Sequence, residues 1–544
     1  MPKGYLMFLL HAHLPYVRHP EYERFLEERW FFEAVTETYI PLIKFFDQLR
    51  DEHVPFKLTM SISPTLANMM EDPLLRERCV KHLDMLVCLA EKECGRTRDW
   101  PDIHFLSQMY KRLFEEARDT FVDRCDTRLV TAFREYARSG NIELITCAGT
   151  HGFLPLLSSE PHTVRAQVFS AVHEHERIFG FKPRGMWVPE CAYYPGLDEV
   201  LEEAGVRYFF VDSHGVENAQ PRPAFDVNAP VYCESGVAAF ARHPTTSKLV
   251  WSSQVGYPAD FNYREYYRDI GHELDDEYLD PFRYAKGVRA PTGIKYHRIT
   301  GPGSDKHLYN PDWAAAATHR HAQDFVNRCR DHAHHTGNHM PLPSAIVSPY
   351  DAELFGHWWF EGPQWLYHVL KELSGSSDLV LGTPGEYLST YPIQQKATPS
   401  ANSWGKKGYH EHWVNPKTEW IWRPLHEAAT RMRKAVEKSA SHKPAQLEER
   451  VLRQAGRELL LAQSSDWPFM ITNGNSAEYG HRRIHDHLNR FHDLLNDLDA
   501  QRNKPHRIDR PRLEALEYTD AIFPELDYRL FAPTDAQRKP LPQS

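Results

Sequence analysis

The chain has 544 residues and a formal net charge of −10, with 64 Lys and Arg against 74 Asp and Glu. Hydrophobic residues make up 41% and charged residues 25%, which is the balance of a globular protein. This length predicts one large catalytic unit with an appended part. The acidic balance, without any basic block, argues against nucleic acid as a partner.

No segment has the pattern of a targeting or membrane element. The first apolar run, residues 5–10, is shorter than a signal-peptide core, and no run approaches the length of a membrane span. The eight Cys residues form no CxxC pair, which favours free thiols in a reducing compartment. We therefore expect a cytoplasmic protein that does not bind a membrane.

The first part of the chain alternates apolar strands with helical segments. Residues 5–10 and 56–62 have the pattern of buried strands, and residues 21–50 between them that of a long amphipathic helix carrying Trp30. His11 and His13 follow the first strand and point the same way, as metal ligands or as donors to a ligand. Residues from about 66 to 140 are rich in charged residues and Leu, and we expect a helical insertion over the mouth of a barrel.

The middle of the chain continues this alternation. Strands are predicted at 141–147, 185–188 and 207–211, with helices at about 160–180 and from 197 to 205. His151 follows the first of these strands, and Glu190 follows the second directly after a Pro. Residues from about 214 to 343 look irregular, with short strands at 237–242 and 249–252, and we expect a lid here.

The last part of the chain repeats the strand-end pattern and then becomes helical. A strand at 345–348 runs into Asp351 and Trp358, and a last strand is expected at 378–381. A polar linker at 392–417 holds Trp404 and Trp413. Helices are predicted at 424–439, 445–464 and 476–498. The His residues at 332–339 and the pair His481 and His485 are interpreted as solvated surface rather than metal sites.

Alternating strands and helices, with polar groups at strand ends, predict an α/β barrel. Glu190 and Asp351 are then the best pair of carboxylates for glycoside chemistry, in which one group attacks and the other protonates the leaving oxygen. Taken alone, Glu190 is equally compatible with a helix cap or a salt bridge. We expect His11, His13 and His151 to donate to sugar hydroxyls and to keep Glu190 ionised, while Asp351 beside Trp358 stays protonated.

Five blocks of the sequence, in order along nearly the whole chain, resemble the five motifs of glycoside hydrolase family 57. They surround His11 and His13, then His151, then Trp187 and Glu190, then residues 350–358, and last Asp466 with residues 467 and 477–479. Within the family the chain is most similar to the 1,4-α-glucan branching enzymes. The resemblance implies a distorted seven-stranded (β/α) barrel at residues 1–400, with the insertion at about 66–140 and the lid region at about 214–343. It also implies a C-terminal all-helical domain at 401–544 that contributes aromatics to the cleft.

The resemblance further implies a retaining mechanism without metal or other cofactor, acting on an α-1,4-glucan and making α-1,6 branches. Glu190 would be the nucleophile and Asp351 the general acid/base. The substrate-binding residues that the motifs and the resemblance suggest are His11, His13, His151, Trp187, Arg264, Trp358, Trp404 and Asp466, with Trp30, Trp413 and Trp467 as aromatic walls.

Three other functions remain open at this point. The expected lid loop at 234–248 contains no Tyr, so the enzyme would be an α-1,4-glucan hydrolase if the loop fails to exclude water. A metal-dependent polysaccharide deacetylase would use His11, His13 and Asp351 as ligands, but would leave Glu190 without a role. A catalytically inactive glucan-binding protein is the third, although both carboxylates are present.

Overall fold

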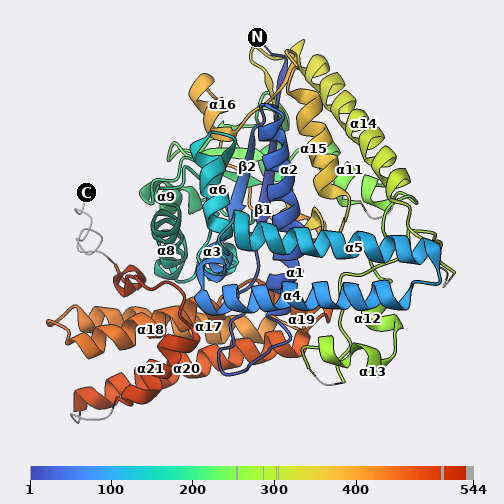
Figure 1. Cartoon of the computed structure of the whole chain (residues 1–544). Helices are drawn as coiled ribbons and strands as arrows, with labels where there is room; N and C mark the ends of the chain where they lie inside the picture. The colour runs from blue at the N-terminus through green and yellow to red at the C-terminus, as the bar shows by residue number, and fades with distance from the viewer. Residues whose placement is uncertain are drawn as a thin grey trace.

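The computed structural model describes residues 2–252, 255–285, 287–301, 303, 305–503 and 508–533. Its centre is one curled sheet in which parallel strands follow one another in the order β7-β5-β4-β3-β2-β1-β8 (Figure 1). These strands are β7 (Ala238–Ala241), β5 (Tyr208–Val211), β4 (Gly185–Trp187), β3 (Ile142–Cys147), β2 (Leu58–Ile62), β1 (Gly4–Ala12) and β8 (Ser344–Asp351). The short β9 (Leu379–Leu381) pairs parallel with the first residues of β1, and β6 (Val231–Tyr232) pairs antiparallel with β7.

The sheet curls far enough for its last strand to meet its first. The backbone N–H of His243, just after β7, donates to the carbonyl of Val347 in β8 at 2.8 Å. Alternate residues of the strands point inward and pack with one another, among them Leu9, Trp187 and Phe240, whereas the other strand residues pack against the surrounding helices. The predicted distorted barrel of seven (β/α) strands is therefore confirmed.

Helices cover the outside of this barrel. They are α2 (Ile40–Asp51), α3 (Pro64–Glu71), α6 (Leu129–Arg138), α8 (Pro161–Phe179), α9 (Leu197–Glu203), α11 (Pro244–Trp251), α14 (Pro311–Gly337) and α15 (Gly362–Leu373). Helix α8 has the expected limits, because Pro161 opens it and Gly180 closes it in the left-handed conformation at φ 86°. The predicted insertion contains a long hairpin, α4 (Pro73–Arg96) and α5 (Pro101–Asp119), which lies across the front of the barrel in Figure 1.

The C-terminal part of the chain is helical. It comprises α17 (Glu419–Ser439), α18 (Gln446–Ala462), α19 (Asp466–Asn473), α20 (Ala477–Asn503) and α21 (Arg510–Thr519). In Figure 1 these helices form the lower layer, toward which β1 runs from the N-terminus at the top. They therefore lie at the carboxyl end of the strands. The last residues of the expected helical domain, 534–544, lie outside the described residues.

Two segments differ from the expected structure near the N-terminus and in the middle of the chain. The first helical segment begins at Arg29 rather than at residue 21, and it divides into α1 (Arg29–Ala34), a π-helical turn at Val35–Tyr39, and α2. The region 214–343 contains the 27-residue helix α14, which the irregular-loop prediction missed. Its buried stripe is built largely from Ala, Thr and Cys, so its hydrophobic periodicity is weak in the sequence.

The predicted lid loop at 234–248 is wrong. The short strand expected within it at 237–242 is confirmed, but it is the barrel strand β7, and much of the remainder is the first half of α11. The strand expected at 249–252 is wrong, because these residues are mostly the end of the same helix. The helix follows from local chemistry: the His243 side chain caps the Thr246 N–H, and Pro244 occupies the first turn. In the described part of the chain no helix is both long and apolar enough to cross a membrane. All eight cysteines are free.

Candidate active site

A cleft of about 510 Å³ lies at the carboxyl ends of the barrel strands and against the C-terminal helices. Both predicted carboxylates, Glu190 and Asp351, line it. So do most of the other predicted site residues, namely His11, His13, His151, Trp358, Trp404, Trp413 and Asp466. Parallel strands bring their carboxyl ends to one edge, which explains why groups so distant in the sequence meet here.

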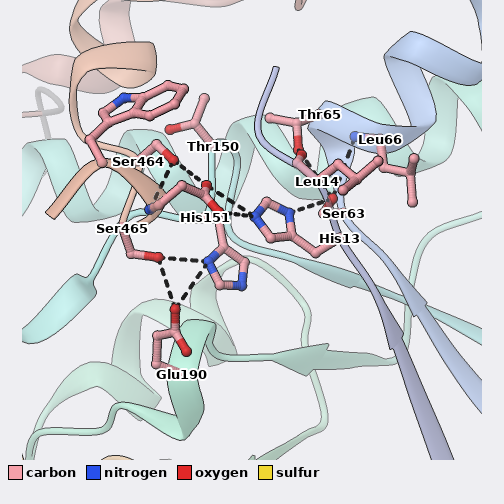
Figure 2. Close-up of polar contacts among 12 residues, drawn as sticks. His13, Leu14, Ser63, Thr65, Leu66, Thr150, His151, Glu190, Ser464 and Ser465 are labelled. Carbon is pink, nitrogen blue, oxygen red and sulfur yellow. Dashed lines mark hydrogen bonds and ion pairs between the residues drawn. The ribbon is translucent and has the colours of Figure 1, made fainter. Parts of the chain in front are cut away.

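Glu190 occupies a strained turn directly after β4. Its φ is 62° and that of Cys191 is 52°, in a left-handed region that residues other than glycine seldom adopt. The turn is held by Trp404, whose backbone N–H donates to the Glu190 carbonyl at 2.9 Å. The indole Nε1–H of the same residue donates to Glu190 Oε2 at 2.6 Å. The Ser465 hydroxyl donates to Glu190 Oε1 at 3.1 Å, as Figure 2 shows.

These contacts act on the ionisation of Glu190 in opposite directions. Burial raises its pKa from 4.5 to about 7, and the nearby Asp466 also raises it, whereas the Trp404 and Ser465 donors lower it. The ionised form of Glu190 is therefore stabilised by the two neutral donors, Trp404 and Ser465, and by His13. Glu190 is half ionised near neutral pH.

The three histidines form one stacked group beside this carboxylate. The rings of His13 and His151 lie 3.8 Å apart and nearly parallel, and His11 Nε2 is 3.0 Å from His151 Nε2. Burial and the neighbouring imidazoles hold the pKa values of His11 and His151 well below the ordinary range, so both are neutral. His151 Nδ1 lies 3.7 Å from Glu190 Oε1 but 2.8 Å from the Ser465 hydroxyl. Of the three histidines, His13 lowers the pKa of Glu190, and it shares this effect with Trp404 and Ser465.

Asp351 ends β8 opposite His11 of β1 in the sheet register. Burial and the nearby carboxylates Glu353 and Glu190 raise the pKa of Asp351 well above its ordinary value, and Arg242 opposes them only in part. These surroundings favour the protonated form of Asp351, which is the direction expected of a general acid. Glu353 lies two residues on, where its Oε1 accepts hydrogen bonds from the Tyr39 hydroxyl and, at 3.2 Å, from the His13 backbone N–H.

One set of side chains in the cleft could hold a metal ion. His13, His151 and Asp466 each offer a ligand atom, all within 4.8 Å of one another. However, His13 Nε2 is already 3.1 Å from both Asp466 oxygens, and its Nδ1 is 2.9 Å from the Ser63 hydroxyl. Burial acts to raise the pKa of Asp466. His13, His151 and Ser464 lower it by more than burial raises it, and the resulting pKa is about 2. The group is thus satisfied by its own hydrogen bonds and does not require an ion to explain it.

Four predicted substrate-binding residues do not line this cleft. Trp187 is fully buried in the barrel interior, where its ring packs against His11 at 5.1 Å and Trp404 at 4.9 Å. Trp467 is also fully buried, and its Nε1–H donates to the carbonyl of Leu461 at 2.8 Å. Both support the cleft from behind.

Trp30 and Arg264 face other cavities. Trp30 lines a neighbouring cavity of about 360 Å³ that shares Leu14, Glu353 and Trp358 with the cleft. Arg264 lines a third cavity, between α2 and α5, with no lining residue in common with the cleft. Trp413 does line the cleft, but only 1% of it is exposed, because its ring stacks on Phe153 at 4.4 Å.

The structure adds residues at the site that the sequence did not indicate. Ser465 is the most important: it is fully buried behind the cleft, where it bridges Glu190 and His151. Arg242, Trp251, His412 and Phe469 line the cleft itself. A signal for Arg242 was present, because it is the last residue of the strand predicted at 237–242. None of the described residues lining the cleft comes from the α4–α5 hairpin, so the insertion does not close the barrel mouth.

A parallel barrel with two carboxyl groups and aromatic walls in one strand-end cleft is the arrangement of a glycoside-processing enzyme. The family model described as glycosyl hydrolase family 57 matches residues 7–392, and the model for the C-terminal part of 1,4-alpha-glucan branching enzymes matches residues 424–531. The chain belongs to glycosyl hydrolase family 57.

The named relatives differ in activity. A 1,4-alpha-glucan branching enzyme of Thermococcus kodakarensis is 34% identical, over 96% of this chain and 77% of its own length. The crystal structure of the alpha-amylase AmyC from Thermotoga maritima is 43% identical, with a TM-score of 0.91, covering 98% of this chain and 99% of that one. The branching enzyme of Pyrococcus horikoshii is 32% identical, with a TM-score of 0.88, covering 99% and 98%.

Proposed function

We propose that the chain is a retaining 1,4-α-glucan branching enzyme. The observation that carries the proposal is the pairing, in one cleft, of Glu190 with its two hydrogen-bond donors and Asp351 with a strongly raised pKa. One carboxyl group is thereby prepared to attack and the other to give a proton, which is the division of labour that retaining glycosidases need. The match of the C-terminal family model to residues 424–531 supports branching in particular.

The proposed reaction has two steps. Glu190 attacks the anomeric carbon of an α-1,4-glucan, and the bond to the leaving chain breaks as Asp351 protonates the departing oxygen. In the second step Asp351 removes the proton from a sugar 6-hydroxyl, whose oxygen attacks the anomeric carbon and releases Glu190. The product carries an α-1,6 branch, and both carboxyl groups return to their starting states. Such a reaction would serve the synthesis of a glycogen-type polysaccharide.

An α-1,4-glucan hydrolase is the second candidate, because the Thermotoga maritima relative is named an alpha-amylase. It would use the same first step, with water in place of the sugar hydroxyl in the second. The two functions differ only in what reaches the intermediate first.

The test is incubation of the purified protein with linear amylose, counting α-1,6 linkages by proton NMR and new reducing ends in the same sample. Many branches with few reducing ends are expected. Reducing ends without branches would instead establish the hydrolase. We expect Glu190→Gln and Asp351→Asn each to lower the rate by orders of magnitude, and near-normal turnover in either variant would remove that residue from its proposed role.

A metal-dependent deacetylase makes a different prediction. Its activity would disappear in a chelator, whereas we expect the glucan activity to survive prolonged dialysis against EDTA, because the proposed mechanism uses protein groups alone. Release of acetate from an acetylated polysaccharide, lost in EDTA and restored by zinc, would favour the deacetylase.

We also propose that residues 1–400 form the catalytic unit and 401–544 a helical unit that completes its cleft. The two family models, which end and begin on either side of residue 400, support this division. The eight free cysteines are compatible with a cytoplasmic location.

A further inference from the structure

The cavity between α2 and α5 that Arg264 lines has a volume of about 680 Å³. Its inner end is formed by Arg264 and Glu361, and its walls include Tyr110, Phe114 and Phe360. Its volume is in the range of small-molecule binding sites, about 300–1,000 Å³. The catalytic cleft shares none of these residues, so the glucan chemistry proposed above gives this cavity no role.

The polar groups at the inner end are buried without a full set of partners. Only 6% of Arg264 is exposed; its guanidinium lies 4.1 Å over the Phe360 ring, and its Nη1 is a long 3.5 Å from both the Tyr110 hydroxyl and the Gly293 carbonyl. Glu361 is 3% exposed, and its Oε1 accepts the Arg264 backbone N–H at 3.0 Å.

The second oxygen of Glu361 is the clearest sign of a missing partner. Oε2 is buried and makes no hydrogen bond of regular geometry to any described residue, although the Tyr309 phenol lies nearby. A buried carboxyl oxygen without a hydrogen-bond partner is costly, so a site of this kind is stabilised by a ligand that supplies one.

The charges and rings around the cavity define the ligand. The lining carries five carboxylates, Glu37, Asp47, Asp51, Glu52 and Glu361, against three cations, Lys44, Arg124 and Arg264. This excess of negative charge disfavours phosphates and other anions. The walls are mainly apolar, so the ligand must combine an apolar face with hydroxyls that both donate and accept. A sugar has this combination.

We propose that this cavity is a second carbohydrate site, which binds a short segment of neutral α-glucan with its hydroxyls between Arg264 and Glu361. The choice of α-glucan among sugars rests on the proposed function. Glu37 lines both this cavity and the one that adjoins the cleft, and its Oε2 is 2.7 Å from His357 Nδ1, next to Trp358 of the cleft. The second site is thus a neighbour of the catalytic one, placed to hold a long glucan that the cleft is processing.

The first experiment fills the cavity. Leu113 of α5 lines it and is half-buried, whereas Arg112 on the same helix is exposed and does not line it. Binding of maltotetraose is measured by calorimetry on the full chain, with Glu190→Gln added to stop turnover. We expect two sites in the Glu190→Gln chain, one site after Leu113→Trp, and two sites after the control Arg112→Trp. A single site before the cavity is filled, or two sites in a folded Leu113→Trp chain, would overturn the proposal.

A second variant protects the test against a failure of Leu113→Trp to fold. Glu361→Gln keeps the shape of the side chain but replaces the unpartnered Oε2 by a donor, and we expect binding at the second site to weaken about tenfold while the cleft is unchanged. Unchanged affinity at both sites would contradict the proposal.

Turnover on amylose separates this proposal from the proposed function. With Glu190 intact, Leu113→Trp should raise KM for long amylose severalfold with kcat unchanged, and a KM equal to that of Arg112→Trp would count against a second site. If two sites are found but no branches form, the proposed function fails and the second site stands. If branches form but only one binding site is found, the proposed function stands and the second site fails.

Discussion

The ionisation of Glu190 depends on a small number of contacts that oppose one another. Burial raises its pKa to about 7, while the Trp404 indole and the Ser465 hydroxyl stabilise the carboxylate and lower it. Because a nucleophile must be ionised, kcat/KM should fall as the pH drops through about 7. Each donor therefore extends activity to lower pH.

Replacing Trp404 by Phe tests this balance. Loss of the Nε1–H removes a hydrogen bond to a charged group, worth about 1.5–3 kcal/mol, and a pKa unit corresponds to about 1.4 kcal/mol. The pKa of Glu190 should rise, so the acidic limb of the kcat/KM profile should move upward by about one to two pH units. The profile is measured on short maltooligosaccharides between pH 5 and 9.

Trp358→Phe is the matched control, because Trp358 also lines the cleft but no hydrogen bond joins it to Glu190 in the described structure. Its acidic limb should stay in place. If Trp404→Phe lowers activity equally at every pH, Trp404 acts on the substrate and not on the ionisation of Glu190.

The sequence predicts the reacting groups better than the groups that tune them. Glu190 and Asp351 are visible because each follows an apolar strand directly. Trp404 and Ser465 lie 214 and 275 residues from Glu190 in the chain, and no local pattern connects a Trp in a polar linker, or a Ser at a helix start, with that carboxylate. Only the tertiary fold brings them together.

At the scale of elements, the π-helical turn Val35–Tyr39 and the loop after β8 support one another. The turn supplies Tyr39, which donates to Glu353, and Glu37, which pairs with His357. The loop approaches so closely that Gly356, at φ 111°, has no room for a side chain, since an added Cβ would lie 1.8 Å from the Glu37 carbonyl oxygen. A π-helical turn is a rare element that often marks a functional site.

Gly356→Ala should therefore disrupt this contact. Both the left-handed backbone and the overlap with Glu37 oppose the new methyl group, and we expect a loss of stability of about 2–4 kcal/mol. Chemical denaturation followed by circular dichroism measures it, and activity should fall because Glu353 belongs to the displaced loop and Asp351, the last residue of β8, directly precedes it. Gly375→Ala is the control, because the Cβ there meets nothing within 4 Å. Equal stability of the two variants would contradict the argued packing.

Elements differ in how well the sequence indicates them. The barrel strands are continuous apolar runs bounded by turns, so β1, β3 and β8 were found close to their limits. Helix α14 was missed because its buried side is rich in small residues. The strand β7 was predicted, at 237–242, but it was placed in a lid region rather than in the barrel because it is only four residues long. The C-terminal helices have strong apolar periodicity and were predicted individually, but their docking on the strand ends follows from contacts distant in the sequence.

At the scale of the whole molecule, the catalytic cleft is assembled from the two ends and the middle of the chain. The N-terminal strand supplies His11, the segment after β4 supplies Glu190, and the turn before α19 supplies Ser465. That turn is fixed on the barrel by two contacts, a bridge between Gly152 and Ser464 and a hydrogen bond from the Ser465 N–H to the His151 carbonyl at 3.0 Å. The helical unit therefore contributes a direct hydrogen-bond donor to Glu190, the proposed nucleophile.

Ser465→Ala measures that contribution without removing the helices. The change deletes the donor to Glu190 Oε1 and the partner of His151 Nδ1, and the loss of one hydrogen bond to a charged group should lower kcat/KM by about 10- to 100-fold near pH 6. The melting temperature should change little, because the backbone contacts of the turn remain. Ser441→Ala, at an exposed serine that bonds only its own helix end in α17, is the control and should keep full activity. If Ser465→Ala were as active as this control, the barrel alone would set the reactivity of Glu190, and the helical unit would act only through the shape of the cleft.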